Sequence, residues 1–195
     1  STNGFGESDG GLETLSATGN YEDLGDVIAW AGTQSWYAEP FVLAGFSLGS
    51  LCMALYAEKH PEKVKALAPI STVVSGKLLL TSPDMRKVRG MWEETKWFIS
   101  DSRSRPGAIK KIPWSFVIDV QKYDLLPKAH LLTMPVLMAV GEDDPTTILA
   151  HQKKFFEVIP SGKKELHIIP KAFHTFRSEE QLAELKRIFD RWLEK

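Results

Sequence analysis

The sequence predicts an α/β fold in which a mostly parallel sheet carries helices on both faces. Short apolar segments bounded by turn-forming residues recur along the chain, as is typical of strands buried on both sides. Longer segments between them have apolar residues at helical spacing. Strands that alternate with helices indicate parallel units, and right-handed crossovers place helices on both faces. A chain of 195 residues is long enough for one substantial domain with a hydrophobic core.

The first part of the chain is expected to form a loop, a helix, a strand and a second helix. Residues 1–19 are polar and glycine-rich, which predicts a loop. Asn20 is a suitable N-cap for a helix whose apolar side chains share one face. The segment 40–46, PFVLAGF, predicts a buried strand. Residues 48–59 are apolar nearly all round, so we expect a helix that is enclosed on most sides.

The middle of the chain is expected to contain one strand and then an insertion. Residues 64–72 predict another buried strand. Residues 76–130 show no clear strand pattern, so we expect a mainly helical cap or lid. Three tryptophans fall in this insertion: Trp92, Trp97 and Trp114. The core of the domain then consists of residues 1–75 and 131–195.

The last part of the chain returns to alternating strands and helices. The segment 134–145 predicts a buried strand that ends in an acidic turn. A helix is expected over about 147–158 and a further strand over 164–170. Ser178 is the expected N-cap of the final helix, and Gln181 completes a capping box with it.

The composition argues against several classes of partner. The net charge of −1 gives no reason to expect nucleic acid or a membrane surface as a partner. No apolar run approaches the roughly 20 residues of a membrane-spanning helix, and residues 1–11 lack the features of a signal peptide. The single cysteine, Cys52, fits a reducing compartment, so we expect the cytoplasm. The sequence has no metal-binding cluster and no nucleotide-binding loop, so neither a metal nor a cofactor is expected.

Three predicted strands are followed by residues that carry chemistry. Ser47 follows the first strand, Asp143 and Asp144 follow the third, and His174 follows the last. The carboxyl ends of parallel strands lie at one edge of a sheet, where α/β proteins bind their ligands. A serine hydroxyl is a weak nucleophile alone, but a histidine base oriented by a carboxylate activates it. We therefore expect a nucleophile, an acid and a base at this edge.

The serine lies within the segment Gly45-Phe46-Ser47-Leu48-Gly49, at a predicted turn from strand to helix. Such a turn strains the serine backbone and crowds its neighbours, which explains a glycine two positions before and after. The helix N-terminus directs backbone N–H groups at the reacting oxygen, so the N–H of Leu48 is the expected oxyanion donor. The motif alone also occurs by chance as a structural turn, but the flanking strand and helix favour a nucleophile.

Several acids and histidines compete for the other two roles. Either Asp143 or Asp144 faces the histidine, and the other caps the turn; acids in or near the insertion, Asp119 and Asp124, are weaker candidates. Only His174 lies in a loop between the last strand and the last helix, so it is the expected base. The other histidines occupy a helix end, a linker, a helix and a strand: His60, His130, His151 and His167.

Four segments of the chain match motifs of one family: NGFGESDG, GFSLGS, PVLMAVGEDDP and IIPKAFHTF. On these motifs the chain resembles the alpha/beta-hydrolase family, and more loosely its cinnamoyl-esterase and serine-aminopeptidase types. In the family the acid usually falls three residues after the glycine of its strand, and counting from Gly141 implies Asp144. Asn3 stands where the family usually has arginine, and Phe173 precedes His174 where glycine or aspartate is usual.

The resemblance implies a serine hydrolase that cleaves a carboxylic ester of a small acyl substrate, with Ser47, His174 and Asp144 as its triad. Aromatic residues at the strand-to-helix turn of residues 45–49, called the elbow below, and in the insertion are the expected substrate-binding residues: Phe46, Trp92, Trp97 and Trp114. Two alternatives remain open. The protein is a non-catalytic, hydrolase-like binding module, or the same triad serves a peptidase, a thioesterase or an acyltransferase.

The chain departs from the family at its start. The family has further strands before the first motif, and one of them pairs with the strand that carries the nucleophile. We therefore expect residues 1–195 to be a C-terminal portion of the domain. A missing N-terminal segment or a second chain is expected to pair with strand 41–46 and to supply the second oxyanion donor.

Overall fold

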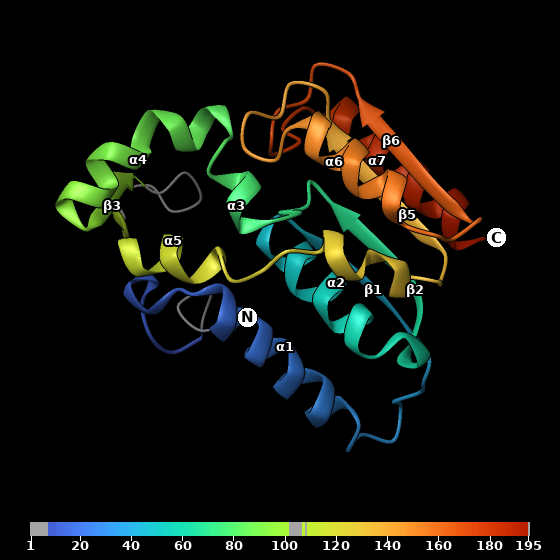
Figure 1. Ribbon diagram of the computed structural model, residues 1–195. Coiled ribbons are helices and arrows are strands. Elements are labelled where there is room, and N and C mark those ends of the chain that lie inside the picture. The colour runs from blue at the N-terminus through green and yellow to red at the C-terminus, as the bar shows by residue number, and fades with distance from the viewer. Residues whose placement is uncertain (1–7, 102–106, 108, 195) are drawn as a thin grey trace.

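The core of the protein is a four-stranded parallel sheet (Figure 1). The computed structural model describes residues 8–101, 107 and 109–194. The strands lie in the order β1-β2-β5-β6, and all neighbouring pairs are parallel. Their bounds are Phe41–Phe46 for β1, Val64–Ile70 for β2, Val136–Gly141 for β5 and Lys164–Ile169 for β6. The predicted parallel sheet is confirmed.

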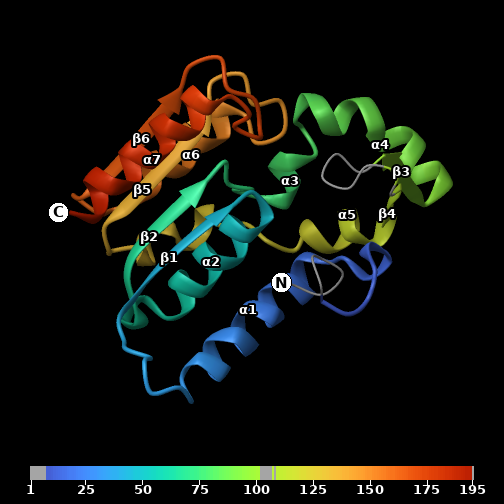
Figure 2. The same ribbon diagram turned by 180° about the vertical axis from the view of Figure 1, so that it is seen from behind.

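Helices cover both faces of this sheet, as the alternation of strands and helices predicted (Figures 1 and 2). On one face lie α2 (Leu48–Lys59) and α6 (Leu149–Val158), and α1 (Ala17–Ala31) packs against α2. The helix α7 (Glu179–Leu193) covers the opposite face. It closes a second apolar cluster, which consists of Ala68, Leu137, Ile169, Ala172, Ile188 and Trp192.

The first helix begins earlier than the sequence suggested. Residues 12–14 form a short 3-10 helix, and α1 begins at Ala17, so the expected loop over 1–19 is wrong for this part; residues 1–7 lie outside the described residues. Ser16 is the N-cap, because its Oγ accepts a hydrogen bond from the Gly19 N–H at 2.9 Å. Asp119 of the insertion accepts from the Thr18 N–H at 2.8 Å and from its hydroxyl at 2.7 Å. This distant partner satisfies a first-turn amide and favours the earlier start over Asn20.

The cap of the last helix follows the prediction in part. The Oγ of Ser178 accepts a hydrogen bond from the Gln181 N–H at 3.2 Å, so the expected N-cap is confirmed. The side chain of Gln181 accepts from the Arg177 N–H at 3.1 Å. A capping box needs that bond to come from the N-cap residue, and it comes from the residue before it.

The insertion combines helices with a hairpin. It contains α3 (Gly76–Leu79), α4 (Pro83–Thr95) and α5 (Trp114–Val120), with β3 (Trp97–Asp101) and β4 (Ile109–Pro113) between the last two helices. The two strands pair antiparallel and form a sheet of their own. The insertion is mainly helical, as expected, but it also contains this hairpin, which the sequence pattern did not indicate. Both strands are short and partly exposed, so they lack the buried apolar run that marked the core strands.

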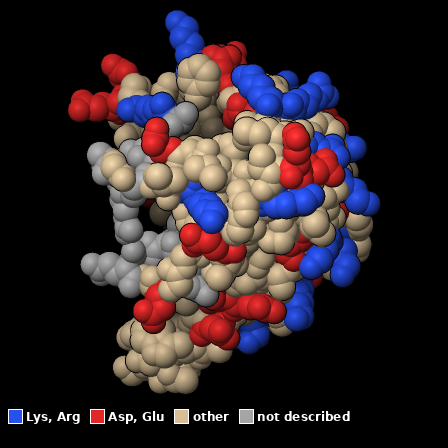
Figure 3. Space-filling view, turned by 90° about the vertical axis from the view of Figure 1, so that its left-hand side faces the viewer, with Lys and Arg blue, Asp and Glu red and all other residues tan. Residues whose placement is uncertain are grey.

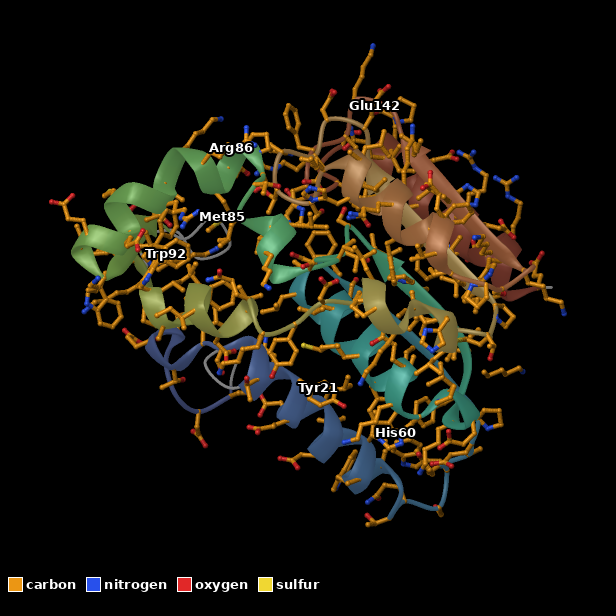
Figure 4. The ribbon with its side chains drawn as sticks, viewed as in Figure 1. Tyr21, His60, Met85, Arg86, Trp92 and Glu142 are labelled. Carbon is orange, nitrogen blue, oxygen red and sulfur yellow. The ribbon has the colours of Figure 1, made fainter. Side chains whose placement is uncertain are left out.

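An aromatic cluster holds the insertion together. Trp92 belongs to α4, is 5% exposed, and directs its side chain toward α5 (Figure 4). Its indole N–H donates to the backbone oxygen of Ile112 at 3.1 Å. The rings of Phe98, Trp114 and Phe116 lie 5.2, 6.0 and 6.2 Å from it, measured between centroids. The insertion thus has an aromatic core of its own, and such contacts add to the free energy of burial.

Strand β1 forms one edge of the sheet. Among the described residues, no strand pairs with its outer side. Apolar side chains are exposed near this edge: Val42 is 42% and Phe46 40% exposed on β1, and Val27 of α1 is 59% exposed. An edge with apolar neighbours is a surface on which another strand can pair.

The surface carries charges of both signs. On the face shown in Figure 3, Lys and Arg side chains alternate with Asp and Glu side chains and form no large patch of one sign. In the part of the chain that the structure describes, no helix combines the length and the apolar character needed to cross a membrane.

Candidate active site

Ser47 occupies the turn between the end of β1 and the start of α2. Its backbone has φ 55° and ψ −119°, a conformation that residues other than glycine rarely adopt. The Ser47 N–H donates to the Ile70 backbone oxygen at 2.9 Å, and the Ser50 hydroxyl donates to the Gly45 oxygen at 2.6 Å. These bonds hold the strained turn and place the Ser47 side chain at the carboxyl edge of the sheet.

The two glycines that flank the serine meet different surroundings. A Cβ atom on Gly45 would lie 2.6 Å from Cε of Met53 and 3.3 Å from the backbone carbon of Gly49, so a side chain there would force Met53 to move. A Cβ on Gly49 would have no atom within 4 Å. The expected crowding is therefore confirmed for Gly45, whereas no close contact explains the glycine at position 49.

The loop after β5 places Asp144 under the histidine. The Asp144 side chain is fully buried, and its Oδ2 lies 2.9 Å from Nδ1 of His174. Asp143, the other candidate, is exposed. A Cβ atom on Gly141 would lie 2.3 Å from the Ala172 backbone oxygen. The glycine at the end of β5 thus lets the loop that carries His174 lie directly against the loop that carries Asp144.

Four hydrogen bonds keep Asp144 ionised. Its Oδ1 accepts from the N–H groups of Thr146 and Thr147, each at 2.8 Å. Its Oδ2 accepts from the Thr147 hydroxyl at 2.6 Å and from His174 Nδ1. Burial disfavours the charged carboxylate, but the bonds from His174 and Thr147 outweigh burial and hold the pKa of Asp144 below its usual value.

His174 joins the acid to the serine. Its Nε2 lies 2.9 Å from Oγ of Ser47, while its Nδ1 faces Asp144. The imidazole side chain is 20% exposed, and the ring of Phe46 lies 5.0 Å from it. With Nδ1 donating to the carboxylate, Nε2 is free to accept the serine proton. This chain of atoms can raise the nucleophilicity of the Ser47 hydroxyl.

A cavity of about 740 Å³ opens beside Ser47 along the free edge of β1. Residues of α1, the elbow, the first turns of α2 and the insertion line it: Asn20, Asp23, Leu24, Val27, Ala44, Gly45, Phe46, Ser47, Leu48, Gly49, Cys52, Met53 and Lys110. Leu48 is the first residue of α2, and the first amides of a helix have no partner within the helix. The Leu48 N–H is therefore free of the helix ladder, as an oxyanion donor must be.

Two family models match adjoining parts of the chain. The alpha/beta hydrolase fold family matches residues 2–96, and the serine aminopeptidase family S33 matches residues 93–181. The chain belongs to the alpha/beta-hydrolase superfamily. Among curated proteins it is 25% identical, over 201 residues, to an uncharacterized 31.7 kDa protein of the traX-finO intergenic region of Escherichia coli. That match covers 88% of this chain and 70% of the other protein.

Solved structures show the same fold as this alpha/beta hydrolase. Mouse alpha/beta hydrolase domain-containing protein 10 superposes with a TM-score of 0.75 at 22% identity, over 99% of this chain and 75% of the other. Est1E of Butyrivibrio proteoclasticus with bound ferulic acid has a TM-score of 0.75 at 20% identity, and the match covers 99% of this chain and 74% of the other. The monoacylglycerol lipase of Paleococcus ferrophilus has a TM-score of 0.72 at 22% identity, and the match covers 97% of this chain and 79% of the other.

The aromatic residues predicted to bind substrate occupy three different places in this alpha/beta hydrolase. Phe46 lines the cavity beside Ser47. Trp92 and Trp114 belong to the aromatic cluster inside the insertion, and neither lines that cavity. The Trp97 ring lies under Nζ of Lys111, 4.2 Å from its centroid. Their part in substrate binding stays a prediction.

The weaker acid and base candidates have other partners. Asp119 holds α1 through Thr18, and Asp124 accepts from the Leu126 N–H at 3.0 Å. Three other histidines have partners outside the site. The His60 ring packs 4.7 Å from the ring of Tyr56, measured between centroids. His151 Nε2 lies 3.4 Å from the Thr81 hydroxyl, and His167 Nε2 lies 3.1 Å from Oε2 of Glu165.

Sequence reasoning missed two residues of the site. The Thr147 hydroxyl donates to Oδ2 of Asp144 and lies 3.3 Å from Nδ1 of His174. An aspartate that accepts from amides two and three residues later forms a common turn, so the segment Asp144-Pro-Thr-Thr carried a signal for this contact. Lys110 enters the cavity from β4 of the insertion, and no local pattern indicates that contact.

Proposed function

We propose that this alpha/beta hydrolase is a serine hydrolase of the carboxylesterase class, which cleaves an ester of a small acyl substrate through an acyl-enzyme. One observation carries the proposal. The atoms from Ser47 Oγ through His174 to Asp144 form an unbroken chain of hydrogen bonds, 2.9 Å long on each side of the imidazole. The chain lies at the carboxyl edge of a parallel sheet and opens on a cavity.

In the proposed first half of the reaction, Ser47 Oγ attacks the carbonyl carbon of the ester and His174 Nε2 takes its proton. The Leu48 N–H donates to the negative oxygen of the tetrahedral intermediate. The bond to the alcohol then breaks, and His174 gives its proton to the leaving oxygen. In the second half a water molecule attacks the acyl-enzyme, His174 takes its proton, and the acid leaves as Ser47 regains a hydrogen.

The cavity supports a small acyl group as substrate. Its volume of about 740 Å³ falls in the range of small-molecule sites, and its walls combine apolar side chains with few charges. The ferulic acid bound to one structural relative and the lipase activity named for another also favour carboxylic acids and their esters. We propose that Phe46 contacts the acyl group. Trp92, Trp97 and Trp114 then act indirectly, by shaping the insertion.

The free edge of β1 bears on how the oxyanion is held. A second oxyanion donor would strengthen the site, since each donor contributes roughly 2.7–4 kcal/mol of transition-state stabilisation. We propose that a further strand pairs with β1 and brings that donor beside Ser47. The strand comes from a segment outside residues 1–195 or from a second chain, and the exposed Val42 and Phe46 support this pairing.

We also propose a cytoplasmic location. Cys52 is buried and forms no disulfide, which fits a reducing compartment.

A peptidase is the second candidate, because the family model over residues 93–181 is that of a serine aminopeptidase. A fluorophosphonate probe, followed by mass spectrometry, tests the nucleophile. We expect covalent label on Ser47 and none in the Ser47→Ala variant. A panel of p-nitrophenyl butyrate, an acyl thioester and an amino-acid anilide then separates the reactions. Turnover of the anilide alone identifies a peptidase, and a folded protein without label is a non-catalytic, hydrolase-like binding module.

A further inference from the structure

The insertion touches the loop of the catalytic acid at the first turn of α4. Asp84, next to the N-terminal Pro83 of this helix, makes two hydrogen bonds to that loop. Its backbone N–H donates to the Pro145 oxygen at 3.2 Å, and its Oδ2 accepts from the Thr146 hydroxyl at 2.7 Å. Figure 4 shows Met85 and Arg86, which follow Asp84, at the end of α4 nearest to the loop after β5.

The bond to Thr146 continues directly into the site. The same threonine whose hydroxyl donates to Asp84 uses its backbone N–H to donate to Oδ1 of Asp144 at 2.8 Å. Thr146 is therefore held from both sides, by one carboxylate of the insertion and by one of the core. Oδ2 of Asp144 in turn faces His174. A continuous path of hydrogen bonds runs from the insertion to the imidazole.

The start of α4 is built to keep this contact in place. The Ser82 Oγ caps the helix by accepting from the Met85 N–H at 3.4 Å, and Pro83 fixes the backbone of the first turn. An anionic side chain in the first turn also interacts favourably with the helix dipole. Asp84 thus has local reasons to remain ordered while it accepts from Thr146.

We propose that Asp84 is a positioning residue, which aligns the insertion with the catalytic acid. It fixes Thr146, Thr146 fixes the orientation of Asp144, and Asp144 fixes the imidazole of His174. This inference rests on the proposed function and extends it to a residue of the insertion. Asp84 does not line the cavity beside Ser47, so its loss affects the chemical step more than the binding of a small ester.

Removal of either partner tests the proposal. We expect Asp84→Ala and Thr146→Val each to lower kcat for p-nitrophenyl butyrate about tenfold, with KM within about twofold, because one hydrogen bond to a charged group is lost. Thr146→Ser keeps the hydroxyl and is expected to restore kcat. In the double variant the loss is expected to match that of either single variant, since both changes break the same bond.

A variant that disturbs the same junction without breaking the bond to Thr146 separates positioning from mere packing. Thr81→Val is the matched control. Its hydroxyl lies in the same junction and donates to the Leu78 oxygen at 2.7 Å, without touching the acid loop. We expect this variant to keep the wild-type kcat and KM.

Three results would overturn the inference: an unchanged kcat in folded Thr146→Val, an equal loss in Thr81→Val, or additive losses in the double variant. If Asp84→Ala does not fold, the nearly isosteric Thr146→Val and its serine counterpart decide the question alone. The proposed function fails separately, when wild-type protein shows neither fluorophosphonate label on Ser47 nor ester turnover. Wild-type turnover together with fully active variants refutes only the role of Asp84.

Discussion

Replacing Glu58 by glutamine is expected to remove a loss of stability that sets in as the pH rises. Glu58 lies in the last turn of α2 and is 5% exposed. Its Oε1 is fully buried and has no hydrogen-bond partner among the described residues. Burial raises the pKa of this carboxyl from 4.5 to about 8; the positive charge of Lys128 opposes the change and the negative charge of Asp124 adds to it.

The sign and the size of the effect follow from this shift. Between pH 4.5 and about 8 the folded protein binds the Glu58 proton while the unfolded chain releases it, so the free energy of unfolding falls as the pH rises. The contribution of the Glu58 proton to stability is complete below the pKa of the unfolded chain, 4.5, and is lost above the pKa of the folded protein, about 8. At about 1.4 kcal/mol for each pH unit, the whole interval corresponds to roughly 3–5 kcal/mol.

Urea unfolding followed by circular dichroism, at intervals from pH 5 to pH 9, measures this dependence. We expect Glu58→Gln to flatten the fall in stability, so that the variant overtakes the wild type toward pH 9. Glu22→Gln, at an exposed glutamate of α1, is the control and is expected to follow the wild-type curve. Parallel curves for Glu58→Gln and the wild type across the whole range would refute the reasoning.

Three further predictions concern the site and its surroundings. Gly141→Ala is expected to cost about 2–4 kcal/mol in thermal unfolding, because its Cβ would lie 2.3 Å from the Ala172 oxygen, whereas Gly49→Ala has open space; equal melting temperatures for the two variants would contradict this. Burial raises the pKa of the Cys52 thiol to about 12, so a disulfide reagent at pH 8 is expected to react only after denaturation, and fast labelling of native protein would count against it. Asp144→Asn is expected to lower kcat for p-nitrophenyl butyrate by about 10³–10⁴-fold while the fold is kept, and a loss below tenfold would remove Asp144 from the proposed mechanism.

Local sequence was sufficient to predict the core sheet and the order of the candidate site residues along the chain. The four core strands are short apolar runs, and the structure confirms each of them as a strand. β5 is fully buried and β2 largely so, whereas every second residue of β1 is exposed, so the expected burial of strand 40–46 is wrong for that face. The turn at Ser47 and the positions of Ser47, an acid and His174 after three of the four core strands were also predictable from the sequence. Parallel connections bring the carboxyl ends of strands to one edge whatever the details of packing.

Other features depended on contacts between distant residues. The hairpin of β3 and β4 lies away from the core sheet, so its strands carry no buried pattern. The start of α1 depends on Asp119, which lies far along the chain from Thr18. The tryptophans of the insertion looked equally suited to bind substrate or to pack, and the structure places Trp92 inside the insertion.

The sequence by itself determined that Ser47, an acid and His174 follow the ends of core strands, and in which order they occur along the chain. Only the tertiary structure brought Asp144 and His174 together, because their contact requires two loops to touch at Gly141. It also linked the insertion to the acid loop through Asp84 and Thr146. Strand ends are set by local hydrophobic patterns, whereas hydrogen bonds between loops depend on how whole elements pack.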